Sequence, residues 1–150
     1  MRAFDATGLS FCHRQADFFA GSLQKSSLSS SRFIKTFMCS DSAAKLDRLE
    51  IVDLPALYPE IRSERSLKNP IRFSADELYW MGYLYRYWCY VEYLSSRQVY
   101  HRMPPSRLRP LFLPYHTQDP AKAIAVIKEN DPSFSQDDYA VVKAILKSKK

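Results

Sequence analysis

The chain has 150 residues, of which 46% are hydrophobic and 25% charged, and its 22 basic and 16 acidic residues leave a net charge of +6 at pH 7. This apolar content excludes a disordered chain, and the length is that of a single domain over residues 1–150. The basic excess is too small to indicate nucleic acid by itself, and it suits any acidic partner.

The N-terminal third predicts helices separated by a loop. Aromatic residues recur at roughly helical spacing in residues 10–20, and Gly21 is typical of the position just past a helix end. Residues 22–31 are rich in serine, whose side chain competes for backbone hydrogen bonds, so we expect a mobile loop there. Residues 32–49 return to a helical pattern, with a new helix cap at Ser40.

Residues 75–93 form an aromatic-rich stretch around which the rest of the chain is expected to pack. Ser74 followed three residues later by Glu77 is a capping box, in which each side chain accepts a hydrogen bond from the other residue's backbone N–H. Aromatic and aliphatic residues fall on every face, which predicts a helix surrounded by other elements with both tryptophans buried. Gly82 indicates a close approach of another backbone. Since no alternating strand pattern is found, the predicted fold is all-α, a compact helical domain wrapped around this helix.

The same stretch is too polar to cross a membrane. A spanning helix needs about 20 predominantly apolar residues, whereas this one carries Arg86 at its middle and a tyrosine hydroxyl at nearly every other position. The N-terminus lacks the uninterrupted apolar run of a secretory signal, and three cysteines without CxxC spacing fit a reducing compartment. We therefore expect a cytoplasmic protein without a membrane partner.

Prolines divide much of the remaining chain into short helices. In residues 50–73 they leave room for only a turn or two of helix. Ser95 with Gln98 repeats the capping box and begins a helix over residues 96–103, which two prolines end.

The C-terminal part predicts two further helices. Asp119 as the cap and Pro120 as the first helical residue begin one of them. Ser135 caps the other, and the basic tail 147–150 is expected to fray.

No residue cluster in the sequence has the pattern of a catalytic, metal or cofactor site. Three isolated glycines cannot form a phosphate-binding loop, and the histidines and cysteines lack the short paired spacings of zinc ligands. His116 and Asp119 could form a catalytic dyad, but a polar turn in which Asp119 caps a helix is several times more common. We therefore expect a protein that is not an enzyme and that holds no cofactor.

The densest positive segment runs from residue 97 to 109, and no acidic residue lies between Glu92 and Asp119. A helix, a corner and a short basic helix resemble a helix-turn-helix in outline, which keeps nucleic acid as an alternative partner. Arginine equally suits docking to an acidic protein, and a solvated face is the remaining interpretation. The residues expected to bind a partner are Arg97, Tyr100, His101, Arg102, Arg107, Arg109, Tyr115 and His116.

Three segments also carry a family resemblance: FIKTFMCSDSAAKLD, ELYWMGYLYRYW and SRQVYHRMPPSRLRPLFLPYHTQDPAKAI. In this order they resemble small bacterial proteins encoded beside an ADP-ribosyltransferase-like toxin in toxin–antitoxin-type loci. The matching positions, within residues 32–128, are Phe33, Ile34, Phe37, Ser40, Ala43, Tyr79, Trp80, Gly82, Tyr87, Trp88, Leu108, Tyr115, His116, Asp119 and Ile124. The resemblance implies a non-enzymatic antitoxin or accessory protein that binds and neutralises a partner protein toxin, and the alternative is a small nucleic-acid-binding regulator that uses residues 97–109.

Overall fold

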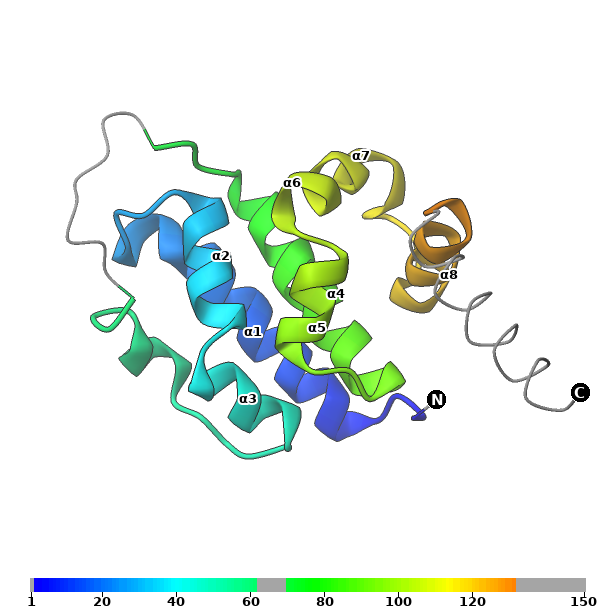
Figure 1. The fold of residues 1–150 in the computed structure, drawn as a ribbon, viewed down its shortest axis with the longest axis horizontal. Coiled ribbons are helices and arrows are strands. Elements are labelled where there is room, and N and C mark those ends of the chain that lie inside the picture. Colours follow the sequence, from blue (N-terminus) through cyan, green and yellow to red (C-terminus); the bar gives the residue numbers. More distant parts are fainter. Residues whose placement is uncertain (1, 62–69, 132–150) are drawn as a thin grey trace, which may run out of the picture. The chain divides into compact units, whose positions relative to one another are not determined.

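The computed structural model of the chain describes residues 2–61 and 70–131 (Figure 1). Every regular element in these ranges is a helix, so the all-α prediction is confirmed. Whereas the sequence predicts one domain over residues 1–150, the chain divides into two compact units, Met1–Pro114 and Tyr115–Lys150. The helix predicted after Ser135 and the basic tail 147–150 lie outside the described residues.

The first unit contains nearly all of the helices. In chain order the helices are α1 (Ala6–Lys25), α2 (Ser30–Met38), α3 (Asp41–Asp47), the 3-10 helix η1 (Leu54–Leu57), α4 (Ala75–Glu92), α5 (Ser96–Arg102), α6 (Pro105–Leu108), the 3-10 helix η2 (Arg109–Leu111), α7 (Phe112–Tyr115) and, in the second unit, α8 (Pro120–Asn130). Among the described residues, no helix combines the length and the apolarity that a bilayer span requires.

Helix α4 is the central element that the sequence predicts. Its capping box is complete, because the Ser74 backbone N–H donates to Glu77 and the Glu77 backbone N–H donates to the Ser74 hydroxyl, at 3.0 and 3.1 Å. From Leu84 to Val91 every residue is buried, so this half of the helix is enclosed on all faces. Trp88 is only 1% exposed, but Trp80 is half-buried, so the prediction that both tryptophans are buried is wrong for Trp80.

Helices α1 and α4 pack closely and run antiparallel (Figure 1). A Cβ atom at Gly82 would lie 2.9 Å from the Gln15 carbonyl oxygen and 3.0 Å from the Ala16 Cα atom, which confirms the predicted close approach of another backbone. The Gln15 side-chain amide donates to the Gly82 carbonyl oxygen at 2.9 Å. Because glycine has no side chain, the backbones of α1 and α4 come close together at this point, and the Gln15 side chain reaches the Gly82 carbonyl oxygen.

Helix α1 continues beyond the end that the sequence predicts. It runs through Gly21 to Lys25 and α2 begins at Ser30, so the loop predicted over residues 22–31 is reduced to a short connection. The guanidinium of Arg72 donates to two carbonyl oxygens in the last turns of α1, at 3.0 and 2.6 Å. The Ser22 carbonyl oxygen also accepts from the Ser26 backbone N–H, so the carbonyl that depends on Arg72 is that of Leu23, in the last turn of α1, where carbonyls lack a partner within the helix.

Several helix caps lie where the sequence places them. The Ser40 hydroxyl accepts from the Ala43 backbone N–H and separates α3 from α2. The capping box of Ser95 and Gln98 begins α5. The Asp119 carboxylate accepts from a backbone N–H in the first turn of α8 at 2.8 Å, so its structural role is the predicted one.

A buried polar network joins α4 to three other helices of the first unit. The side chain of Arg86 is 2% exposed, and its three guanidinium nitrogens donate to Gln15 of α1, Asp47 of α3 and Ser96 of α5, at 2.8, 2.6 and 2.7 Å. The Ser96 hydroxyl and backbone N–H both donate to the Asp47 carboxylate. A buried charge is tolerated only when it is paired and fully hydrogen-bonded, and Arg86 meets both conditions.

Candidate functional site

The basic residues expected to bind a partner lie mostly on α5 and on the short helices that follow it. Ser96, Val99 and Met103 occupy the inward side of this helix and are buried. Arg97 and His101, four residues apart, share the outward side and are exposed. Together with the exposed Arg102 and Arg107 they form what we call the basic face, which consists of Arg97, His101, Arg102 and Arg107.

Two side chains of the basic face are ordered by hydrogen bonds to helix ends. The guanidinium of Arg97 donates to the carbonyl oxygen of Cys39, the C-terminal cap of α2, at 2.7 Å. The guanidinium of Arg107 donates to the carbonyl oxygen of Arg102, the last residue of α5, at 3.0 Å. Cations are favoured at helix C-termini because the unpaired carbonyls there carry partial negative charge.

The helix beneath the basic face is anchored to the core. The Tyr85 hydroxyl donates to the Met103 carbonyl oxygen at 2.6 Å, at the C-terminal end of α5. At the other end, Ser96 belongs to the buried network around Arg86. Tyr100 is half-buried, and its ring meets the His101 ring edge-on at 5.4 Å. Burial is the main reason that the pKa of Tyr100 is raised, so this hydroxyl stays neutral and can only donate or accept a hydrogen bond at physiological pH.

The side chain of Arg109 is held by contacts within the first unit and is not part of the basic face. Its guanidinium pairs with the Glu77 carboxylate at 2.9 Å and lies 4.3 Å from the centre of the Phe73 ring. Burial alone would raise the pKa of Glu77, but the bonds from Arg109 and from Ser74 outweigh it and leave that pKa lowered. Because these contacts hold its side chain against α4 and Phe73, Arg109 is not counted in the basic face.

Tyr115 and His116 belong to the second unit. Tyr115 is half-buried at the end of α7, and His116 is exposed in the turn before α8. Since Asp119 caps α8, its carboxylate is already used in the fold.

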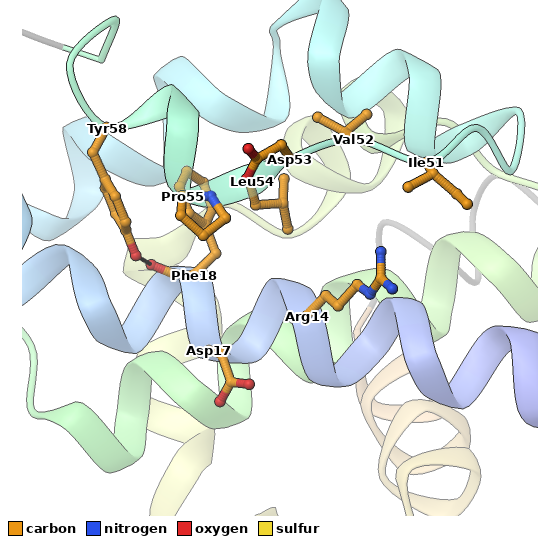
Figure 2. A pocket seen from close by; sticks show the side chains of 9 residues that line it. All are labelled: Arg14, Asp17, Phe18, Ile51, Val52, Asp53, Leu54, Pro55 and Tyr58. Atoms are coloured by element: carbon orange, nitrogen blue, oxygen red, sulfur yellow. Dashed lines mark hydrogen bonds between the residues drawn. The ribbon is translucent and has the colours of Figure 1, made fainter.

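The first unit also contains an apolar groove that the sequence does not predict (Figure 2). It has a volume of about 460 Å³ and lies between α1 and the chain that leads from α3 into η1. The lining residues are Arg14, Asp17, Phe18, Ile51, Val52, Asp53, Leu54, Pro55 and Tyr58. Its size falls within the range of about 300–1,000 Å³ that is typical of ligand sites.

One end of the apolar groove is closed by Tyr58. The Tyr58 hydroxyl donates to the Phe18 carbonyl oxygen at 2.7 Å, and the two rings lie 4.7 Å apart (Figure 2). Burial raises the pKa of Tyr58 to about 12, with the nearby charge of Asp17 as the smaller cause. A Cβ atom at Gly21 would lie 2.5 Å from the Tyr58 oxygen, so the glycine makes room for this hydroxyl beside α1.

The buried cysteines are poor candidates for chemistry. Burial raises the pKa of Cys12 to about 12 and that of Cys89 to about 11, although the charge of Arg86 opposes both shifts. Neither is a thiolate near neutral pH, and the thiolate is the reactive form. Within residues 2–61 and 70–131, no three His, Cys, Asp or Glu residues come together in a way that could hold a metal ion.

Comparisons of the chain with models of protein families, with curated proteins and with solved structures gave no significant match.

Proposed function

We propose that this chain is a non-enzymatic protein of the antitoxin type, which binds an acidic surface of a partner toxin through the basic face. The observation that supports this proposal most is the basic face itself, because three of its four residues are exposed on α5, a helix whose two ends are fixed to the core, and the fourth, Arg107, is exposed on α6. Docking is favoured when the contacting side chains are ordered before the partner arrives, since less conformational entropy is then lost. The resemblance to proteins encoded beside an ADP-ribosyltransferase-like toxin supplies the kind of partner.

The composition of the basic face favours a protein over a nucleic acid. It has arginine and histidine but no lysine, and two of its guanidiniums already donate to helix carbonyls. Arginine is enriched at protein interfaces, whereas grip on a phosphate backbone relies on many cations that together release counterions. A nucleic-acid regulator remains the rival proposal, and salt dependence separates the two.

Replacing His101, Arg102 and Arg107 together with glutamine is expected to weaken toxin binding about tenfold, mainly through slower association. Arg97 and Arg109 are left unchanged because their guanidiniums bond to α2 and α4, whereas the guanidinium of Arg107 bonds within the basic face, to the Arg102 carbonyl oxygen. The measurement is association kinetics of the purified chain with the neighbouring toxin at two salt concentrations. The rate for the parent should fall as salt rises, and the rate for the variant should depend on salt much less.

A matched control replaces Lys25 and Lys122 with glutamine. It removes two permanent positive charges, as the triple variant does, but outside the basic face. Both lysines are exposed, and the control should bind the toxin as the parent does. Equal binding by the triple variant and the parent would exclude the basic face as the docking surface. If the triple variant instead lost DNA affinity, with the slope of log affinity against log salt reduced by about 0.9 per lost phosphate contact, the nucleic-acid proposal would replace this one.

A further inference from the structure

We propose that the apolar groove binds an extended peptide segment of a protein partner, which inserts a large apolar side chain beside Phe18 and places an adjacent carboxylate on Arg14. This goes beyond the antitoxin proposal, because it uses none of the residues of the basic face. Three independent features of the groove support it, namely its apolar lining, the unpaired backbone of one wall and an unpartnered arginine.

The lining of the groove fits an apolar side chain. Leu54 is buried at its base, and Phe18 of α1 forms the opposite side. Ile51 stands at the rim and is 81% exposed. A partner that covered this rim would remove apolar surface from water and gain the corresponding free energy.

One wall of the groove offers backbone hydrogen bonds. In the described part of the chain, the backbone N–H groups of Ile51, Val52 and Asp53 find no acceptor, and the carbonyl oxygens of Ile51 and Val52 find no donor. Asp53 has an extended conformation, with φ −79° and ψ 90°. Unpaired backbone groups in a non-helical segment can pair with the backbone of a peptide that lies beside it.

The charges around the groove indicate a single carboxylate on the partner. Arg14 is exposed and has no hydrogen bond or ion pair with any described residue. Its guanidinium extends toward the Ile51 end of the groove, whereas the Asp17 carboxylate points to the other side of α1 (Figure 2). Arginine binds carboxylates through two parallel hydrogen bonds. Asp53 also lines the groove and would repel a strongly acidic segment, so one carboxylate next to an apolar residue fits best.

The test begins with a library of random 12-residue peptides displayed on phage and selected on the immobilised full-length chain. Selected peptides should share a large apolar residue next to aspartate or glutamate. One such peptide is then made synthetically and titrated into the isotope-labelled chain, where the amide resonances of Ile51, Val52 and Asp53 should shift. Failure to enrich this pattern, or shifts confined to other residues, would overturn the proposal.

Variants of the groove provide the second readout. Arg14→Gln and Ile51→Ser each alter an exposed side chain and should leave the melting temperature unchanged, while each weakens binding of the synthetic peptide about tenfold. The control Lys25→Gln should bind as the parent does, and a peptide methylated on its central backbone nitrogens should bind poorly because it cannot pair with the wall. Unaltered affinity of both groove variants would contradict the proposed site. If the basic-face variant lost its binding to the toxin but still bound the peptide, the groove and the basic face would be two independent binding surfaces.

Discussion

Replacing Arg86 with methionine is expected to lower the free energy of unfolding by about 3–5 kcal/mol, the usual cost of removing one partner of a buried ion pair. The substitution leaves Asp47 as a largely buried carboxylate, with a side chain only 14% exposed, and deprives Gln15 and Ser96 of a donor. A small domain has about 5–15 kcal/mol of stability, so the loss should be easily measured by urea denaturation.

The matched control is Arg48→Met, which removes an arginine from an exposed pair. Arg48 lies 2.7 Å from Glu50, but the two side chains are 62% and 50% exposed. Such pairs contribute about 0–1 kcal/mol, so this variant should unfold almost as the parent does. If Arg86→Met were as mild as the control, the Arg86 network would have no structural role.

Replacing Trp88 with alanine should cost about 3–5 kcal/mol and lower the melting temperature by on the order of 10 °C or more. The ring is 1% exposed, and its Nε1–H donates to the Glu92 carboxylate at 3.0 Å. The cavity left behind cannot collapse easily, because the residues of α4 on both sides of Trp88 are themselves buried.

Trp80→Ala is the internal comparison for this prediction. Trp80 is half-buried and meets the Phe112 ring edge-on at 5.8 Å, so less apolar area is lost and the shift in melting temperature should be clearly smaller. Equal shifts for the two tryptophan variants would contradict the asymmetric burial of α4.

Features encoded by neighbouring residues could be predicted from the sequence. The capping boxes at Ser74 and Ser95 each depend on a partner three residues away, and both occur as predicted. The all-α class follows from the same local patterns. The close approach at Gly82 could also be predicted, because glycine lowers the stability of a helix and is expected there only where a larger residue would not fit. The backbone of α1 occupies that space.

Features that depend on distant residues could not be predicted. The pattern around Gly21 indicates a helix end, but α1 continues to Lys25, and the guanidinium of Arg72 donates to two carbonyl oxygens in its last turns from a part of the chain 49 and 50 positions away. Arg109 belongs to the densest basic segment, yet its carboxylate partner, Glu77, lies in the first turn of another helix. A count of charges along the chain contains no information on such pairs.

The apolar groove could not be predicted from the sequence either, because it too depends on distant residues. Its wall is a non-helical segment over residues 51–53 with neither periodicity nor a motif, and only folding brings this segment beside Phe18. The one available sequence signal was the run of apolar residues ahead of Pro55, which resembles an ordinary connector.

The proposed neutralisation is measured most directly by the growth of bacteria that express a candidate toxin of the ADP-ribosyltransferase-like kind named in the proposal, with or without this chain. The parent chain should restore growth and co-purify with the toxin, and the variant that replaces His101, Arg102 and Arg107 with glutamine should restore growth less at an equal expression level. The Lys25 and Lys122 control should act as the parent does. Arrested growth in the presence of the folded parent chain, with no complex recovered, would contradict the proposed function.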